Sequence, residues 1–314
     1  MDIVDADFVK ALTRIKPFIN RTPVLTSHYF DNLFNSELFF KCENFQKAGA
    51  FKSRGAVNAI FSLTSYEAKN GVATHSSGNH AQALARAAGL RGIPAYIVMP
   101  ENAPQVKIDA VLGYGGDITF CKPSLEARES TLKNILLKTN AVEIHPYDNN
   151  KVIEGQGTAA MELLERYPNL DTILCPVGGG GLLSGTALAV NRFSPATKVI
   201  GCEPAQADDA FKSFYSGKFI PSLNPNSIAD GLLTSLGKLT FPIIKNHVSG
   251  IVTVSENGII KAMRLIYERM KIVIEPSAAV PLAAILENKI NIKGMNVGVI
   301  LSGGNVDLDK LPWI

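Results

Sequence analysis

The sequence predicts an α/β protein with two open, twisted, mostly parallel sheets flanked by helices. Three observations lead to this prediction. Short runs rich in β-branched and aromatic residues alternate with amphipathic stretches along the chain, as in parallel sheets that helices cover on both faces. The 314 residues exceed the usual size of one domain, so two lobes are expected. No internal repeat and no low-complexity segment interrupts the alternation.

Hydrophobic periodicity locates the predicted elements. Short apolar runs predict strands at 38–42, 72–76, 95–99, 117–121, 172–177, 198–203, 251–254 and 296–301. Apolar residues at helical spacing predict helices at 79–89, 124–138, 157–166, 182–192, 257–270 and 277–287. Turn-forming residues at 69–71 and 147–150 are the candidate boundaries between the lobes.

Composition and charge narrow the class of protein. Hydrophobic residues make up 46% of the chain and charged residues 19%, as in an ordinary globular protein. The net charge of +3 favours neither nucleic acid nor an acidic membrane surface as a partner. No apolar run approaches the roughly 18 residues of a membrane span. The four cysteines form no CxxC pair, and the first residues lack the features of a signal peptide, so a cytoplasmic protein is expected.

The segment Gly178-Gly179-Gly180-Gly181 directly follows a predicted strand and opens a predicted helix. Consecutive glycines let backbone N–H groups converge, and a helix N-terminus favours negative charge, so this segment predicts a phosphate-binding loop. A tight strand–helix turn is the simpler alternative, although four glycines exceed what a turn needs. The dinucleotide fingerprint fails at Leu183 and Ser184, but Glu203 after the next strand keeps a dehydrogenase open as a minor alternative. A Walker loop fails because Leu239 stands where Ser or Thr is required.

A lysine, Lys52, lies between Phe51 and a run of small residues ending at Gly55. Burial lowers the pKa of a lysine, and a neutral amine is what imine formation requires. Most lysines are solvated, however, so these residues by themselves favour an ordinary surface lysine.

The segment Ser76-Ser77-Gly78-Asn79-His80 joins a predicted strand to the predicted helix at 79–89. Ser and Asn at the start of a helix usually cap it. The same N–H and hydroxyl groups can bind a substrate carboxylate, and the two interpretations are about even. His80 alone is more typical of a hydrogen-bonded core histidine than of a catalytic base.

The last polar segment, Ser302-Gly303-Gly304-Asn305, follows the strand predicted at 296–301. Ligands of open parallel sheets bind at the carboxyl ends of the strands. The segments 76–80 and 178–181 have the same placement after their own strands. The three segments are therefore expected to meet in one ligand site.

Taken together, these residues resemble the fold type II pyridoxal-phosphate enzymes, which share the fold of the tryptophan synthase β subunit. Within that family the chain is most similar to the serine racemase and threonine/serine dehydratase group, and to the eukaryotic serine racemases in particular. Supporting segments cover nearly the whole chain: Pro23–Ser27, Gly92–Val98, Gly155–Thr158, Ile228–Gly231 and Glu268–Lys271. The resemblance implies a large cofactor-binding domain (1–68 and 149–314) and a small flexible domain (69–148), with the cofactor in the cleft between them.

The resemblance also implies how pyridoxal 5'-phosphate is held. Lys52 is expected to bind it as an imine, and Phe51 to pack on its pyridine ring. Asn79 is expected to contact the phenolic oxygen, Ser302 the ring nitrogen, and the backbone of Gly178–Leu182 the phosphate. Because a serine hydroxyl is neutral, it does not force the ring nitrogen to stay protonated, which weakens the cofactor as an electron sink.

The reaction implied is the interconversion of L- and D-serine, with β-elimination to pyruvate and ammonia as a side reaction. Lys52 and Ser77 are expected on opposite faces of the substrate α-carbon, so that one removes a proton and the other delivers one. The alternative is a dehydratase for L-threonine, L-serine or 3-hydroxyaspartate with little racemisation, and a third hypothesis is a catalytically silent binding protein. The residues expected at the amino-acid substrate are Ser76, Ser77, Asn79, His80 and Arg128, although Arg128 is also typical of a solvated helix charge.

Two further sites are implied by the resemblance alone. A divalent cation, Mg²⁺ or else Ca²⁺ or Mn²⁺, is expected on Glu203, Asp209 and the carbonyl of Ala207, a set of oxygen ligands that suits these ions. An ATP effector is expected at the interface of a homodimer. Its candidate residues are Ser27, Lys47, Gln82, Tyr114, Lys271 and Asn305.

Overall fold

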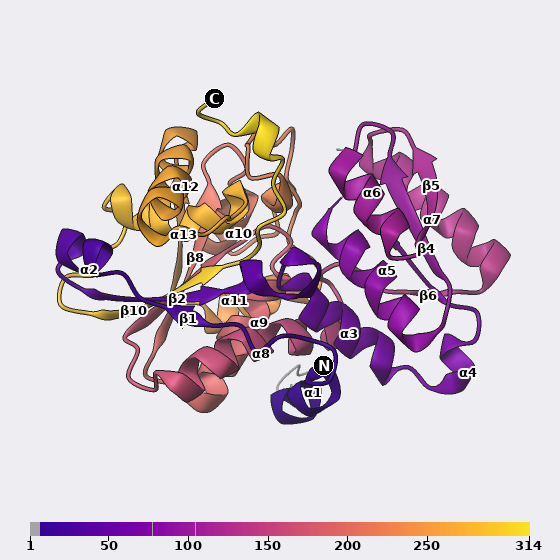
Figure 1. Ribbon diagram of the computed structural model, residues 1–314, viewed down its shortest axis with the longest axis horizontal. Coiled ribbons are helices and arrows are strands. Elements are labelled where there is room, and N and C mark those ends of the chain that lie inside the picture. The colour runs from indigo at the N-terminus through magenta and orange to yellow at the C-terminus, as the bar shows by residue number, and fades with distance from the viewer. Residues whose placement is uncertain (1–6, 77, 104) are drawn as a thin grey trace.

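Two separate sheets organise the chain (Figure 1). The computed structural model describes residues 7–76, 78–103 and 105–314. The larger sheet has the strand order β1-β2-β10-β7-β8-β9, from β1 (Val24–Leu25), β2 (Glu37–Cys42), β7 (Thr172–Pro176), β8 (Lys198–Pro204), β9 (Gly250–Val254) and β10 (Asn296–Leu301). The smaller sheet has the order β5-β4-β3-β6, from β3 (Val72–His75), β4 (Ala95–Pro100), β5 (Asp117–Cys121) and β6 (Val142–Glu143).

Nearly all strand pairs are parallel, as the sequence predicts. Only β1 runs antiparallel to its neighbour β2 among the described strands. All eight predicted apolar runs coincide with a strand. The two-residue strands β1 and β6 were not predicted, because two residues are too few to carry a periodic pattern.

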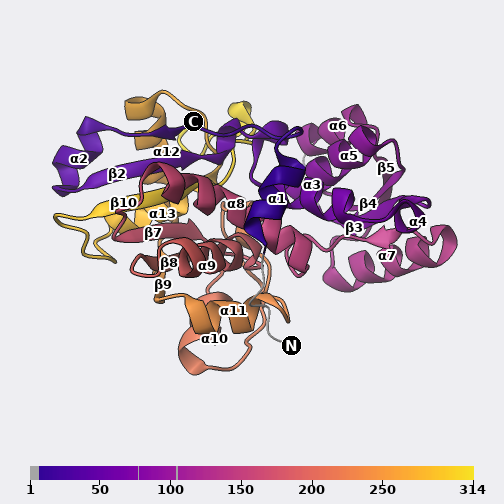
Figure 2. The same cartoon turned by 90° about the horizontal axis from the view of Figure 1, so that it is seen from below.

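Helices cover both faces of the larger sheet (Figure 2). On one face, α8 (Asn150–Arg166) and α9 (Gly181–Phe193) pack against Ile173 and Ile300. On the other face, α12 (Glu256–Met270) and α13 (Pro276–Leu286) pack against Leu174 and Val299. Successive strand residues point to opposite faces, so a strand buried on both sides reads as a continuous apolar run.

The smaller sheet has its own helices and its own core. These helices are α4 (Ser65–Ala68), α5 (Asn79–Arg91), α6 (Gln105–Gly113) and α7 (Leu125–Thr139). They form with the sheet the body at the right of Figure 1. The predicted boundaries at 69 and 148 fall in the connections before β3 and after β6, and the division into domains at these residues stays a prediction.

Two helices carry the chain between the bodies. The helix α3 (Lys52–Ser62) precedes the small sheet, and α8 follows it. Their backbones approach closely at two glycines: a Cβ on Gly155 would lie 2.8 Å from the Cα of Gly55. The structure begins α8 at Asn150 rather than at 157, because the side chain of Asn149 accepts the N–H groups of residues 151 and 152 and caps the helix.

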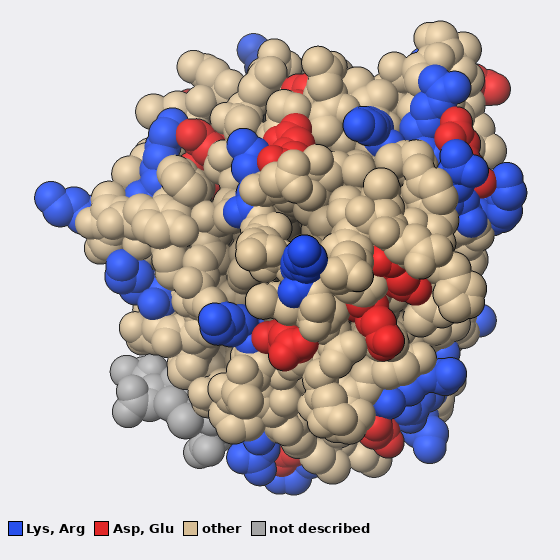
Figure 3. All heavy atoms as spheres, turned by 90° about the vertical axis from the view of Figure 1, so that its left-hand side faces the viewer, with Lys and Arg blue, Asp and Glu red and all other residues tan. Residues whose placement is uncertain are grey.

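Several short elements were not predicted. They are α1 (Phe8–Ile15), α2 (His28–Phe34), α10 (Asp209–Ser216), α11 (Thr240–His247) and the 3₁₀ turns η2 (Glu43–Phe45), η3 (Lys47–Gly49), η4 (Asp230–Leu232) and η5 (Leu308–Lys310). The helices α3, α4 and α6 were not predicted either. On the face of the molecule in Figure 3, acidic and basic side chains are interspersed, so neither sign dominates that face. Within the described part of the chain, no helix has both the length and the apolar composition needed to cross a bilayer.

Candidate active site

A cavity of about 1120 Å³ lies between the two sheets, at the carboxyl ends of β3, β7 and β10. The three polar segments that the sequence singled out all reach it, so they line one cavity. The expected cofactor and substrate residues that line the cavity are Phe51, Lys52, Ser76, Asn79, His80, Arg128, Gly178, Gly179, Gly180, Gly181, Leu182 and Ser302. Ser77, the expected second acid–base group, lies outside the described residues.

Lys52 is the first residue of α3, and its amine lies in this cavity. The Nζ atom donates to the carbonyl of Pro146 at 2.8 Å and lies 5.1 Å from the ring centroid of Phe51. Burial lowers the pKa of Lys52 to about 8, although the negative charge of Glu275 opposes the shift. About a tenth of this amine is therefore neutral at pH 7, far more than of an ordinary lysine, and the neutral form is what imine formation requires.

A buried cluster of four charges holds the helix that carries Lys52. Arg54 donates through Nε to Glu43 at 2.7 Å and through Nη2 to Glu162 at 2.8 Å. Lys41 donates to the same carboxylate of Glu162 at 2.6 Å. All four side chains are almost fully buried. Because two cations face two anions with their hydrogen bonds satisfied, the cluster fixes α3 two residues beyond Lys52.

The glycine loop has no room for side chains. A Cβ on Gly178 would lie 2.7 Å from the Cα of Leu232, and one on Gly179 only 2.3 Å from the ring of Tyr147. Gly180 has φ +86°, a conformation that favours glycine, and it precedes the first turn of α9. The loop therefore offers backbone N–H groups and a helix N-terminus to the cavity, a combination suited to a phosphate.

Ser302 lies beside Phe51 and points an unused hydroxyl into the cavity. The N–H of Phe51 donates to the carbonyl of Ser302 at 3.0 Å, which joins the first and last motifs of the chain. The side-chain oxygen of Ser302 is buried and has no hydrogen-bond partner. A buried hydroxyl without a partner is costly unless a ligand completes it, so this atom fits the ring nitrogen of pyridoxal phosphate.

Asn79, expected at the phenolic oxygen, is held by two protein partners. Its Nδ2 donates to both carboxylate oxygens of Glu275, at 2.8 and 2.9 Å. Its Oδ1 accepts from Nδ2 of Asn305 at 2.9 Å. Burial, reinforced by Asp230, raises the pKa of Glu275 to about 7. Glu275 was not predicted, and its only sequence signal is an acidic residue directly before Pro276, at the start of α13.

Three histidines at the cavity are neutral at pH 7. Burial lowers the pKa values of His75 and His145 to about 4, and it lowers the pKa of His80 strongly. His80 donates from Nε2 to the carbonyl of Ile144 at 3.0 Å, because a carbonyl can only accept. Cations at the cavity are consequently lysines and arginines such as Arg128 on α7, whose Nε donates weakly to the carbonyl of Ser124 at 3.4 Å.

The residues expected at the divalent cation gather after β8. The carboxylate of Glu203 accepts the N–H groups of Ala210 and Phe211 at 2.9 and 2.8 Å. Both carboxylate oxygens of Asp209 are buried without a hydrogen-bond partner. Burial and then the charge of Asp209 raise the pKa of Glu203 to about 9. Burial, with a smaller contribution from the charge of Asp208, raises the pKa of Asp209 to about 6. No cluster of three or more His, Cys, Asp or Glu side chains forms a metal site among the described residues, so a cation here would need the carbonyl of Ala207 as well.

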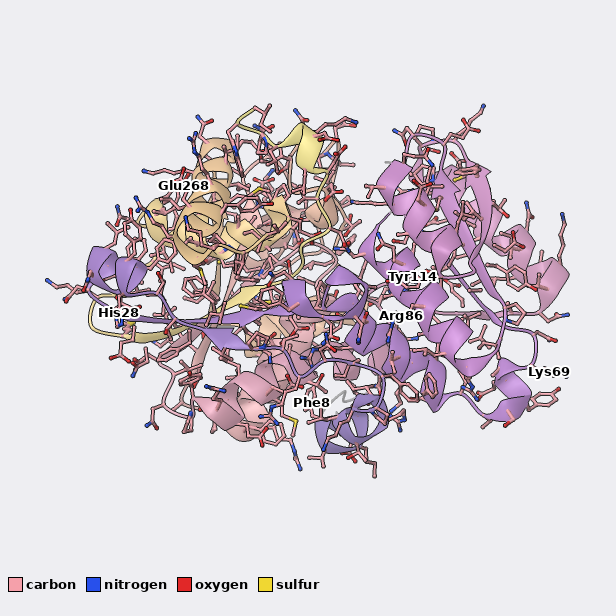
Figure 4. All side chains as sticks on the ribbon, in the orientation of Figure 1. Phe8, His28, Lys69, Arg86, Tyr114 and Glu268 are labelled. Atoms are coloured by element: carbon pink, nitrogen blue, oxygen red, sulfur yellow. The ribbon has the colours of Figure 1, made fainter. Side chains whose placement is uncertain are left out.

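The residues expected at ATP come from both the large-sheet and the small-sheet parts of the chain. Figure 4 labels His28, the neighbour of Ser27, far from Tyr114 on the small body. Gln82 is buried in α5, whereas Lys47 and Lys271 are exposed. Asn305 donates to the carbonyl of residue 48 and to Asn79, so it supports a residue that lines the cavity described above.

Residues 15–303 match the family described as pyridoxal-phosphate dependent enzymes, and the chain belongs to this family. A β-hydroxyaspartate dehydratase from Paracoccus denitrificans is 54% identical over 98% of both chains. A serine racemase from Dictyostelium discoideum is 52% identical over 98% of this chain and 96% of the relative. The solved structure of maize serine racemase is 46% identical, with a TM-score of 0.95 over 98% of this chain and 94% of the other. The predicted family and fold type are thereby confirmed.

Proposed function

We propose that the chain is a pyridoxal-phosphate dependent serine racemase that also eliminates serine to pyruvate and ammonia. The observation that carries the proposal is the amine of Lys52, whose pKa is lowered to about 8 in a cavity shared with the glycine loop and Ser302. The 52% identity to the Dictyostelium discoideum serine racemase supports the choice of substrate.

The proposed roles follow from the atoms available. Lys52 is a base near neutral pH, and Ser77 is proposed as the proton donor on the opposite face of the substrate α-carbon. Pyridoxal phosphate, when bound, withdraws electrons from that carbon and so acidifies its proton. The glycine loop would bind the phosphate, the Ser302 hydroxyl the ring nitrogen, and Phe51 one face of the ring. For Asn79 to contact the phenolic oxygen, one of its N–H groups must leave Glu275.

Substrate binding is proposed at the loop before α5. The hydroxyl of Ser76, the N-terminus of α5 at Asn79 and the backbone near His80 would orient the carboxylate. The imidazole of His80 is a poor carboxylate ligand, because its one N–H donates to Ile144. Arg128 is proposed as a second cation near the substrate.

A dehydratase with little racemisation is the second candidate. The 54% identity to the β-hydroxyaspartate dehydratase of Paracoccus denitrificans favours it specifically. The same cavity and the same lysine serve this reaction, because loss of a β-hydroxyl also begins with removal of the α-proton.

We also propose a divalent cation at Glu203, Asp209 and the Ala207 carbonyl, an ATP effector and a homodimer. The orphaned oxygens of Asp209 support the cation. Exposed Tyr29, with the guanidinium of Arg269 4.4 Å from its ring centroid, is a surface feature suited to a protein contact. Four free, buried cysteines support a reducing, cytoplasmic setting.

The test is a chiral product assay with L-serine, with and without Mg-ATP. The proposal expects D-serine together with pyruvate. Pyruvate without D-serine would favour the dehydratase, and neither product from any hydroxy amino acid would contradict both candidates. Lys52→Ala is expected to abolish every reaction, whereas Ser77→Ala is expected to suppress racemisation and leave some elimination. Equal racemisation by wild type and Ser77→Ala would overturn the role of Ser77.

A further inference from the structure

One ion pair crosses the cavity between the two bodies. Lys107 on α6 donates from Nζ to the carboxylate of Asp230 on η4. It is the one ion pair between described side chains that joins the small-sheet helices to the rest of the chain. The side chain of Lys107 is 9% exposed and that of Asp230 is 48% exposed. Both residues line the cavity, so the pair forms part of its wall.

The pair lies next to the loop proposed for the substrate carboxylate. The Nζ atom of Lys107 is 3.5 Å from the position that a Cβ on Gly78 would occupy. Its charge also reaches Glu275, whose pKa Lys107 lowers and Asp230 raises. A substrate with its carboxylate at Gly78 and its α-carbon at Lys52 thus has the Lys107 ammonium and the Asp230 carboxylate beside it on the cavity wall.

We propose that the Lys107–Asp230 pair determines how the cavity discriminates between serine and its dicarboxylic analogue 3-hydroxyaspartate. The inference deepens the proposed function and rests on it for the position of the substrate. Asp230 neutralises the charge of Lys107, so an uncharged β-substituent such as the serine hydroxyl experiences little net charge from the pair. A second carboxylate on the substrate is attracted by Lys107 and repelled by Asp230, and it competes with Asp230 for the ammonium group.

Removing the charge of Asp230 and removing the charge of Lys107 should therefore have opposite effects on the affinity for a dicarboxylate. Asp230→Asn leaves Lys107 uncompensated, and binding of a dicarboxylate tightens. Lys107→Met leaves Asp230 uncompensated, and binding weakens. A pair that only held the two bodies together would respond differently, because loss of either partner would then weaken binding. The opposite signs separate specificity from a purely structural role.

The experiment measures binding of succinate and of butyrate to the cofactor-loaded enzyme by calorimetry. Succinate carries two carboxylates and butyrate one, at the same chain length. We expect the dissociation constant of succinate to fall about tenfold in Asp230→Asn and to rise about tenfold in Lys107→Met. Butyrate, whose one carboxylate lies at Gly78, should shift in the same directions by a clearly smaller factor. The ratio of kcat/KM for 3-hydroxyaspartate over L-serine should move in the same two directions.

Glu165→Gln is the matched control. It removes the carboxylate of an exposed ion pair, with Arg21 at 2.9 Å, that does not line the cavity. It should change neither ligand's binding. If Asp230→Asn or Lys107→Met fails to fold, as judged by thermal unfolding, Asp230→Ser and Lys107→Gln repeat the charge changes.

Changes of the same sign in both variants, or no change in succinate binding, would overturn the inference. Succinate binding requires no turnover, so its outcome is independent of the reaction catalysed. If the wild-type enzyme racemises serine but the two variants do not shift succinate binding in opposite directions, only this inference is contradicted. Opposite shifts in an enzyme that turns over no hydroxy amino acid would instead contradict the proposed function.

Discussion

At the scale of single residues, Lys52 destabilises the cofactor-free protein, because its ammonium group is buried in the cavity. The pKa of this amine is about 8 in the folded chain, against an ordinary value of 10.5. Between pH 8 and 10.5 the unfolded chain binds more protons than the folded chain, so the free energy of unfolding rises with pH there. Below pH 8 both states are protonated, and the full cost of burying the charge is present.

Lys52→Met should therefore stabilise the cofactor-free protein at pH 7 by about 2 kcal/mol. The pKa shift alone corresponds to roughly 3 kcal/mol, and loss of the hydrogen bond to Pro146 subtracts from that value. The gain should shrink as pH rises from 8 towards 10.5. Denaturant unfolding at several pH values measures it. Lys261→Met, at an exposed lysine, is the control without such a trend. A gain independent of pH would contradict the burial argument.

The sequence identified most of the residues expected at the cofactor and substrate, for different reasons, but only a minority of all the residues that line the cavity. The glycine loop and Ser302 follow from their position after strands, whereas Lys52 was distinguished from a surface lysine only by the family resemblance. Glu275 and the Lys107–Asp230 pair were missed. Their partners are far away in the sequence, and only tertiary packing brings, for example, Glu275 to Asn79.

At the scale of elements, the glycine loop and the ring of Tyr147 fit against each other. Gly179→Ala would introduce a Cβ 2.3 Å from that ring. We expect unfolding to become easier by about 1–3 kcal/mol and the dissociation constant of pyridoxal phosphate to rise at least about tenfold. Thermal unfolding and a cofactor titration measure the two effects.

This prediction has a control at a second glycine, Gly113, and a double variant that tests the contact with the Tyr147 ring. Gly113→Ala, at the end of α6, meets nothing within 4 Å and should change stability by less than about 1 kcal/mol. Tyr147→Ala makes room at Gly179, so the double variant should lose less than the sum of the two single losses. Strict additivity would show that the ring is not the obstacle.

Elements were predictable from the sequence in proportion to their length and regularity. Buried parallel strands such as β10 are continuous apolar runs and were located correctly. Short helices such as α2 and α11 were missed, because fewer than ten residues give a weak periodic signal. The helix α3, with 11 residues, was missed as well, since most of its residues are buried and no single apolar face stands out. The start of α8 was predicted too late, since it is set by the cap at Asn149 rather than by apolar spacing.

At the scale of the whole molecule, a divalent cation should raise the temperature of unfolding. The raised pKa values of Glu203 and Asp209 show that their charged forms are costly in this buried place, and a cation bound there would stabilise these forms. At 100 times its dissociation constant, Mg²⁺ or Ca²⁺ should raise the midpoint by about 5 °C. Asp209→Asn should unfold at a higher temperature than wild type without metal and should lose the response.

Asp208→Asn is the matched control for the cation, because that carboxylate pairs with Lys212 at the surface. It should keep the response to metal. The same response in Asp209→Asn as in wild type would remove Asp209 from the cation site.

The two-sheet architecture could be predicted from strand–helix alternation alone, whereas the shape of the cavity depends on how the bodies pack.

The contact between α3 and α8 has a consequence for how the small-sheet body joins the rest of the chain. Because the chain leaves the larger body and returns to it through helices whose backbones touch at Gly55 and Gly155, the small-sheet body begins and ends at neighbouring points. A segment with adjacent ends can be exchanged as a cassette without rerouting the remainder. Exchange of this segment would replace one side of the cavity and leave Lys52 and the glycine loop in place.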